Sequence, residues 1–262
     1  MKEPITYSDL QLREVFHLEF LKSFGSKVNA KYYALKGGVN IRFFYNSIRY
    51  SEDMDLDVQE MEVAVLKDKV MQILAGASFH ERLVPFGIKQ VIPPNIGKAK
   101  QTETTQRFKV HLLTEAGADL FTKIEFSRRG FAGTIQVQPV ADIVLSQYKS
   151  APVVVPHYDK YSAFLHKIKA LADRTIIQAR DIFDLFTLSS QIGRDKFGTQ
   201  GVSTNTIKTA KDNVFSVSFE QFRDTVLSYI SLDDQKIYDN KDVWAEVRIK
   251  VVEFMESAVS GE

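Results

Sequence analysis

Residues 51–58, which read SEDMDLDV, place Asp53, Asp55 and Asp57 at alternate positions, with one apolar residue after each. Successive side chains of a β-strand point to opposite faces, so this spacing predicts a strand whose apolar residues enter a core while the three carboxylates share the other face. Convergent carboxylates supply the oxygen ligands and the negative charge that a hard divalent cation requires. The segment therefore favours a Mg²⁺ or Mn²⁺ site; the alternative interpretation is a solvated acidic edge of a strand.

The size and composition of the chain suit one large core or two modest ones, because it has 262 residues, of which 44% are hydrophobic and 26% charged. No apolar run reaches the roughly 18 residues of a bilayer span, and the first residues, MKEPITYSDLQLREVF, lack the basic-then-apolar order of a signal peptide. The absence of cysteine excludes disulfides and thiolate zinc sites. We therefore expect a cytoplasmic protein with no membrane contact.

The spacing of apolar residues predicts an α/β (α+β) fold with two lobes. Expected helices lie at 7–24, where Ser8 caps an amphipathic helix, and at 39–47, 60–75 and 141–148, and expected strands at 31–36, 51–58, 87–93, 107–115, 120–129 and 134–140. Residues 94–106 are polar and turn-rich, which predicts a mobile connection, and residues 198–206 form a Gly/Thr/Ser-rich loop. The patterns become almost entirely helical after residue 162, so we expect a mixed-sheet lobe at 1–150 and a helical lobe at 151–262.

Several familiar motifs are absent. A calcium-binding EF-hand loop that began at Asp53 would need Gly at the sixth position and Glu at the twelfth, where this chain has Val58 and Ala64. No P-loop, dinucleotide fingerprint, HExxH or GxSxG pattern occurs. The usual signatures of nucleotide-loop, zinc-hydrolase and serine-hydrolase chemistry are therefore missing.

A more specific constellation remains. Gly37 and Gly38 separate an expected strand from an expected helix, a turn that can offer backbone N–H groups to a triphosphate. Glu125 lies between Ile124 and Phe126 in another strand, where it is either a third carboxylate of the metal site or only the solvent-facing side of an amphipathic strand. Carboxylates on adjacent strands can hold the metal ions that activate an attacking hydroxyl and neutralise a leaving pyrophosphate.

Two separated motifs resemble those of a known family. LKGGVNIRFFYNSIRYSEDMDLDV is similar to the signature of the AbiEii/AbiGii toxin family, a branch of the polymerase-β-like nucleotidyltransferase superfamily, and HKIKALADRTIIQARDIFDLFTL is similar to that family's C-terminal motifs. The resemblance spans residues 33–188, with the two motifs in the family's order. It implies catalytic roles for Asp53, Asp55, Glu125, Lys167, Asp181 and Asp184, nucleotide contacts from Lys36, Gly37, Gly38, Ser51 and Lys167, and metal binding by Asp53, Asp55 and Glu125. The carboxylate–apolar alternation also allows the register Asp55/Asp57 for the metal pair.

The second motif also has an independent physical interpretation. Asp181 and Asp184 lie three residues apart, so they share a face of a helix and can face a cleft. Lys167 supplies a compact cation that can bind a nucleotide phosphate or the departing pyrophosphate, with Lys169 as the neighbour that could be mistaken for it. The alternative is a lysine–aspartate salt bridge on a solvated helix pair.

The family resemblance implies a toxin that transfers NMP from an NTP to an acceptor hydroxyl, with Mg²⁺ or Mn²⁺ as cofactor, RNA or tRNA as acceptor and a winged-helix antitoxin encoded nearby. A net charge of +1 gives no overall attraction to RNA, so any contact must come from local cations, for which the candidates are Lys98, Lys100, Arg107, Lys109, Arg128 and Arg129. The alternative interpretation is that these cations belong to a solvated loop and to a strand end whose arginines pair with nearby carboxylates. The rival functions are a nucleotidyltransferase acting on a small molecule or protein, and a catalytically silent binding module.

Overall fold

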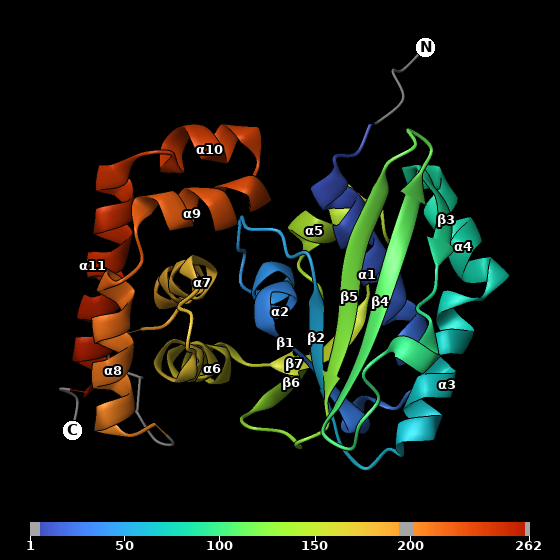
Figure 1. The fold of residues 1–262 in the computed structure, drawn as a ribbon, viewed down its shortest axis with the longest axis horizontal. Coiled ribbons are helices and arrows are strands. Elements are labelled where there is room, and N and C mark those ends of the chain that lie inside the picture. Colours follow the sequence, from blue (N-terminus) through green and yellow to red (C-terminus); the bar gives the residue numbers. More distant parts are fainter. Residues whose placement is uncertain (1–5, 194–201, 260–262) are drawn as a thin grey trace. The chain divides into compact units, whose positions relative to one another are not determined.

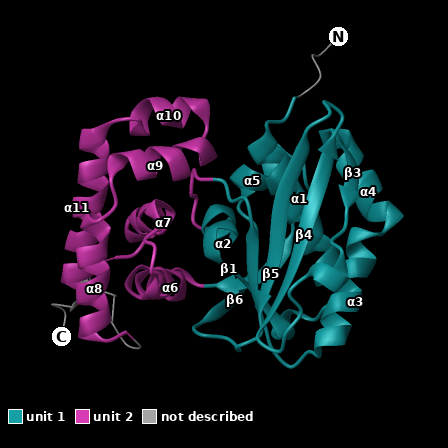
Figure 2. Ribbon diagram, viewed as in Figure 1, with its two compact units in different colours: residues 1–44, 50–158 teal, residues 45–49, 159–262 magenta. Residues whose placement is uncertain are grey.

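The computed structural model describes residues 6–193 and 202–259 (Figure 1). Its contacts divide the chain into two compact units, one made of Met1–Phe44 and Tyr50–Tyr158 and the other of Tyr45–Arg49 and Asp159–Glu262 (Figure 2). The division after Tyr158 differs from the predicted lobe ranges 1–150 and 151–262, because a strand at residues 154–158 pairs within the sheet of unit 1. Part of the Gly/Thr/Ser-rich segment 198–206 lies outside the described residues.

Unit 1 contains one mixed sheet, in which the described strands follow the order β3-β4-β5-β2-β1-β7-β6 (Figure 1). The strands are β1 (Tyr33–Lys36), β2 (Met54–Val58), β3 (Ile88–Ile92), β4 (Thr105–Thr114), β5 (Asp119–Ser127), β6 (Ile135–Pro139) and β7 (Val154–Tyr158). Strand β2 pairs antiparallel with β1 and parallel with β5, so it lies in the middle of the sheet. The predicted strands are confirmed; β7, which contains Pro156, was not predicted because its apolar run shows no alternation.

The helices of unit 1 are α1 (Asp9–Gly25), α2 (Gly37–Phe44), α3 (Val63–Leu74), α4 (Ala77–Leu83) and α5 (Asp142–Gln147), with 3₁₀ turns η1 (Ala30–Tyr32), η2 (Val84–Phe86) and η3 (Ile96–Lys98). Ser8 caps α1 as predicted, in a reciprocal capping box with Gln11. The amphipathic character predicted for α1 is wrong, because Glu14, His17 and Glu19 are buried along with its apolar residues. Each of these polar side chains has a hydrogen-bond or ion-pair partner, which makes burial on several sides tolerable.

Alternation along the central strands separates a core face from a polar face. Met54, Leu56 and Val58 of β2 are at most 1% exposed and belong to the main core, together with apolar residues of α1, α3 and α4. Residues on the opposite face of the strand include Asp55, whose Cα partners are Lys36 on β1 and Glu125 on β5. The period of two in SEDMDLDV therefore sorts the carboxylates onto one face, as predicted from the sequence.

Unit 2 is helical in its described part, as predicted. Its helices are α6 (Lys160–Asp173), α7 (Ala179–Ser189), α8 (Thr204–Phe215), α9 (Phe219–Thr225), α10 (Leu232–Tyr238) and α11 (Lys241–Val259), with one 3₁₀ turn, η5 (Leu227–Tyr229). Trp244 of α11 stacks on Phe222 of α9, which contacts Phe183 of α7, and all three rings are buried. None of the helices in residues 6–193 and 202–259 has both the length and the apolar character that crossing a bilayer requires.

Candidate active site

The turn between β1 and α2 brings the backbone against an aspartate. Gly37 has a φ of +71°, a conformation that L side chains rarely adopt, and a Cβ placed there would lie 2.9 Å from Asp55 Oδ2. Any other residue at this position would therefore be strained and would clash with the carboxylate. The structure thus places Gly37 directly against Asp55.

Asp53 lies just before β2 and is only partly satisfied. Its Oδ2 atom pairs with Lys123 Nζ at 2.7 Å, whereas its Oδ1 atom is buried without a hydrogen-bond partner among the described residues. The Ser51 hydroxyl donates to the carbonyl of Asp53 at 2.8 Å, so Ser51 shapes this turn through its backbone. A buried carboxylate oxygen without a partner is costly, which makes it a natural place for a cation to bind.

Asp55 carries the strongest sign of crowded negative charge. Burial raises the pKa of the Asp55 carboxyl, and the nearby carboxylates of Glu125 and Asp53 raise it further, against the opposing effect of Lys36 and Lys123. The pKa of Asp55 is therefore above its ordinary value. Three carboxylates that act on one another in this way form an acidic centre that a divalent cation would relieve.

Glu125 and Asp53 are each neutralised by a neighbouring side chain. Arg107 Nε lies 2.7 Å from Glu125 Oε2, and Lys123 pairs with Asp53 as described above. Within the described residues, no three His, Asp or Glu side chains are arranged as a ready-made metal site. The donor set nevertheless suits Mg²⁺ or Mn²⁺, because it consists of carboxylate oxygens, one of them buried and unpartnered.

Asp57 has a different environment from Asp53 and Asp55. Its residue is 4% exposed, its Oδ1 atom pairs with Lys36 Nζ at 2.6 Å, and its Oδ2 atom accepts a hydrogen bond from the Tyr158 hydroxyl at 2.6 Å. Both oxygens are thus bound by side chains of unit 1. This arrangement favours the register Asp53/Asp55 over Asp55/Asp57 for the metal pair.

In unit 2, Lys167 contacts both predicted aspartates. Its Nζ atom lies 2.8 Å from Asp181 Oδ1 and 2.6 Å from Asp184 Oδ2, and both carboxylates are fully buried. The predicted shared helix face is correct. The lysine–aspartate salt bridge considered as the alternative is present, but it is buried rather than solvated. Lys169, by contrast, is exposed, which supports Lys167 as the lysine of this motif.

Two arginines also pair with these aspartates, the buried Arg49 and the exposed Arg174. Arg49 Nη2 lies 2.8 Å from Asp184 Oδ1 and 2.9 Å from Asp184 Oδ2, and Arg174 Nε lies 3.0 Å from Asp181 Oδ2. Sequence reasoning missed Arg49, which is 4% exposed. The only available signal was a charge between Ile48 and Tyr50 in a segment without periodicity.

Asp184 and Lys167 hold each other in their charged forms. Burial disfavours the charge on Asp184, but Arg49 and Lys167 outweigh this and keep the pKa of its carboxyl below the ordinary value. Burial also disfavours the charge on Lys167, yet Asp181 and Asp184 raise the pKa of its ammonium above the ordinary value. Near neutral pH Asp184 and Lys167 are therefore both charged.

The candidate RNA-contacting cations are not equivalent. Arg128 donates to the Gln106 side chain at 3.0 Å and to the carbonyl of Met61, so part of its guanidinium is already engaged within unit 1. Arg107 is paired with Glu125. The exposed candidates are Lys98, Lys100, Lys109 and Arg129.

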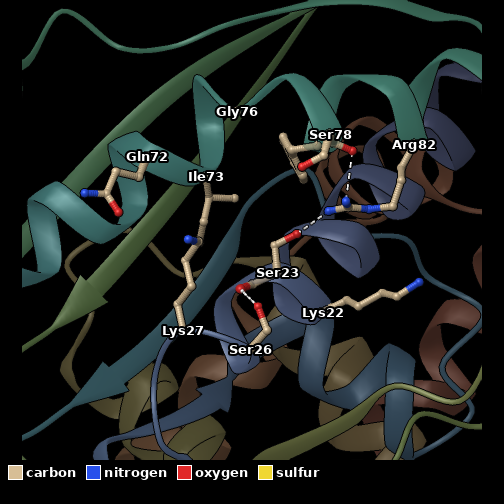
Figure 3. Close-up of a pocket in the computed structure, with 10 residues that line it drawn as sticks. Lys22, Ser23, Ser26, Lys27, Gln72, Ile73, Gly76, Ser78 and Arg82 are labelled. Carbon is tan, nitrogen blue, oxygen red and sulfur yellow. Dashed lines mark hydrogen bonds between the residues drawn. The ribbon is translucent and has the colours of Figure 1, made fainter.

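A separate cavity of about 560 Å³ lies in unit 1 beside α1, α3 and α4 (Figure 3). Lys22 and Lys27 line it, together with Arg82, but Arg82 already binds Glu19, Ser23 and the carbonyl of Ser78. None of the predicted site residues lines this cavity. It is therefore distinct from the acidic centre.

Comparisons with known proteins agree with the fold. The chain is similar to JHP933 from Helicobacter pylori, at 18% identity and a TM-score of 0.59 over 98% of this chain and 96% of the other. It is also similar to MenT4, a nucleotidyltransferase toxin from Mycobacterium tuberculosis H37Rv, at 15% identity and a TM-score of 0.61 over 96% of this chain and 84% of the other. No curated protein sequence matches significantly. The predicted nucleotidyltransferase fold is confirmed.

The family assignment rests on a broader match. The profile described as "Nucleotidyl transferase AbiEii toxin, Type IV TA system" matches residues 19–256, which include both sequence motifs and nearly all of the described structure. The predicted family and the predicted nucleotidyltransferase activity are therefore confirmed. This chain belongs to the AbiEii family of nucleotidyltransferase toxins of type IV toxin–antitoxin systems.

Proposed function

We propose that this nucleotidyltransferase is metal-dependent and transfers NMP from an NTP to a hydroxyl of RNA, with tRNA as the expected acceptor. The observation that carries the proposal is the buried, unpartnered Oδ1 atom of Asp53, in an acidic centre where Asp55 lies against the Gly37 turn. This combination offers a carboxylate site for a cation and backbone N–H groups for a phosphate within one unit.

Asp53, Asp55 and Glu125 are the residues that would hold Mg²⁺ or Mn²⁺. A bound divalent cation supplies charge neutralisation for the attacking hydroxyl and for the leaving pyrophosphate. Lys123 pairs with Asp53 Oδ2 and Arg107 pairs with Glu125 Oε2, so a cation could bind the unpartnered Asp53 Oδ1 while both ion pairs remain in place. The two ion pairs offset part of the negative charge of the acidic centre.

The Gly37–Gly38 turn is the proposed binding site for the phosphates of the NTP, with Lys36 directly before it in sequence and Ser51, near Asp53, as a further proposed nucleotide contact. In unit 2 the cations Lys167 and Arg49 balance the buried anions Asp181 and Asp184, and the exposed Arg174, which pairs with Asp181, adds a surplus of one positive charge that suits a phosphate. We propose Lys167, Asp181 and Asp184 as catalytic residues on this basis, with Lys167 as the phosphate-binding cation.

RNA is proposed as the acceptor because cations share a face of the sheet with the carboxylates. Lys109 on β4 lies opposite Lys123 on β5, two residues along from the opposed pair Arg107 and Glu125. Such cations can bind a phosphate backbone without reading sequence. The toxin would act in the cytoplasm, where NTPs and tRNA are abundant, and a winged-helix antitoxin would be encoded nearby.

The test is incubation of the purified protein with each α-labelled NTP, Mg²⁺ and total RNA. We expect label in RNA of tRNA size with one NTP preferred, and loss of the label with EDTA. Asp119→Asn serves as a matched control, because Asp119 is an exposed aspartate of the same sheet that pairs with His111. Label in protein or small molecules but not in RNA would overturn the RNA acceptor, and label that survives EDTA would overturn metal dependence.

A further inference from the structure

We infer that Asp57 is a positioning residue: it holds the ammonium of Lys36 away from Asp55 and so leaves Asp55 free for a divalent cation. The inference rests on the proposed metal site. It also accounts for the third aspartate of SEDMDLDV, which the metal pair does not require. Asp57 would thus act on the reaction through Lys36 and Asp55, without touching substrate or metal.

The register of the sheet places Lys36 within reach of two aspartates. Lys36 and Asp55 are direct Cα partners across β1 and β2, and Ala34 is the partner of Asp57. Directly opposed side chains on one face have Cβ atoms about 5 Å apart, and diagonal neighbours are still within reach of a long side chain. A lysine at this position can therefore form an ion pair either with the opposed Asp55 or with the diagonal Asp57.

The structure shows that Lys36 forms its ion pair with Asp57. Its Nζ atom lies 2.6 Å from Asp57 Oδ1, and Tyr158 fixes the other oxygen of Asp57 from β7. The Tyr158 hydroxyl itself accepts a hydrogen bond from the backbone N–H of Ala132 at 3.0 Å. Asp57 is thus a buried, oriented anion, and the loss of the Lys36 cation would be costly. This environment makes Asp57 the stronger partner for Lys36.

The consequence concerns Asp55. Without a charge at position 57, the carboxylate nearest to Lys36 by register is Asp55; in the structure Lys36 forms its ion pair with Asp57 and acts on Asp55 through space, where its charge opposes the rise in the pKa of Asp55. An ammonium paired with Asp55 would compete with a divalent cation for the same oxygens. Because a close opposite charge alters the binding of another cation by about one log unit or more, Asp57→Asn should weaken cation binding about tenfold.

The experiment is titration of the full chain, without nucleotide, with Mn²⁺ followed by calorimetry and by electron paramagnetic resonance. We expect Asp57→Asn to raise the Kd for Mn²⁺ about tenfold. The double variant Asp57→Asn/Lys36→Met removes the competing ammonium and should restore a Kd within about threefold of that of the unchanged chain. Tyr158→Phe is the matched control: it removes the other partner of Asp57 but leaves the Lys36 pair, so the Kd should stay unchanged.

Two results would overturn the inference. One is an unchanged Kd for Mn²⁺ in Asp57→Asn; the other is equal weakening of Mn²⁺ binding in the single and double variants, which would indicate a structural effect.

If Asp57→Asn does not fold, the Kd of Lys36→Met for Mn²⁺ tests the inference by itself. Since Asp57 holds the ammonium away, Lys36→Met should change the Kd less than about threefold, and a tenfold tighter Kd would mean that Lys36 already competes at Asp55. If the unchanged chain binds no Mn²⁺, the proposed metal site fails; if it binds and only the variants disagree, this inference fails alone.

Discussion

At the scale of single residues, three aspartates in one strand segment have three different environments. Asp53 has a buried oxygen without a partner among the described residues, Asp55 lies against a glycine turn among other carboxylates, and Asp57 is bound on both oxygens. Identical side chains two positions apart therefore differ in what they can bind. The difference comes from the residues on the neighbouring strands, since the three share the same local sequence pattern.

Replacement of the proposed metal ligands should separate activity from stability. We expect Asp53→Asn and Asp55→Asn each to lower transfer at saturating Mg²⁺ by at least about 100-fold, because a ligand for the charge-neutralising cation is lost. Asp55→Asn should also raise the melting temperature of the metal-free protein at pH 7, because the raised pKa of Asp55 means that its ionised form costs stability there.

Labelled-NTP transfer and thermal unfolding measure these two effects, with Asp119→Asn as the control. The stabilisation by Asp55→Asn should shrink as the pH falls, because the carboxyl of the unchanged chain then becomes protonated and neutral. Transfer at the level of the unchanged chain in both Asp53→Asn and Asp55→Asn would contradict the assignment.

At the scale of elements, α1 is tied to the segment before β2 by a buried polar chain. The Thr122 hydroxyl donates to the carbonyl of Glu52 at 2.7 Å, so its oxygen, 2.9 Å from His17 Nε2, accepts from a protonated Nε2. Burial, with a further contribution from Arg13, lowers the pKa of His17 to about 3. The neutral ring is therefore a requirement of the folded state, and it links α1 to the residue that precedes Asp53.

This chain of hydrogen bonds predicts a loss of stability in mild acid. Unfolded His17 gains a proton as the pH falls below about 6.5 while the folded side chain does not, so stability is full above that pH and decreases below it. Between pH 7 and pH 5 His17 should cost about 2 kcal/mol in the free energy of unfolding. His17→Gln keeps an N–H donor but cannot titrate, so its urea unfolding should lose about 2 kcal/mol less over that interval; equal losses would show that the ring is not buried neutral.

Two lysines of helix α6 have different environments: Lys167 pairs with the buried aspartates of α7, and Lys169 is exposed. Lys167→Met removes a cation from two buried carboxylates, so it should abolish transfer and lower the free energy of unfolding by about 3–5 kcal/mol. Lys169→Met, on the same helix but exposed, should leave transfer unchanged and stability within about 0.5 kcal/mol. Transfer assays at a temperature where both variants are folded test the pair, and equal effects would show that the register of the motif was misread.

At the scale of the whole molecule, net charge decides how RNA can be bound. With a net charge of +1, the protein has no overall attraction for a polyanion, so binding must come from local cations and must weaken with salt. Lys109 and Arg129 are exposed, whereas Arg128 anchors the chain to Met61 and Gln106. The informative substitutions are therefore at the first two positions and not at Arg128.

Charge reversal at these positions should reduce RNA labelling selectively. We expect Lys109→Glu/Arg129→Glu to weaken RNA binding and to lower the slope of log affinity against log salt by about two, because each reversal leaves one phosphate of the RNA without its neutralising cation. NTP binding should be unaffected. The matched control is Lys208→Glu, an exposed lysine of the helical unit. RNA labelling that is indifferent to salt and to the Lys109 and Arg129 reversals would contradict binding through the phosphate backbone.

The sequence by itself determined the elements whose signals are local. The period of two in residues 51–58 predicted β2 and the shared carboxylate face, the capping residue Ser8 predicted the start of α1, and the glycine pair predicted the turn that Asp55 contacts. These features depend on backbone geometry and on burial of alternate residues, which neighbouring residues alone can specify.

Only the tertiary structure decided which charged groups pair. Lys36 binds the diagonal Asp57 rather than the opposed Asp55, Arg107 binds Glu125, and Arg49 reaches Asp184 across 135 positions of sequence. The burial of polar residues in α1 and the place of β7 in the sheet were likewise set by distant segments. The physical reason is that an ion pair or a sheet position depends on which strands and helices meet in space, and periodicity within one segment carries no record of its partners.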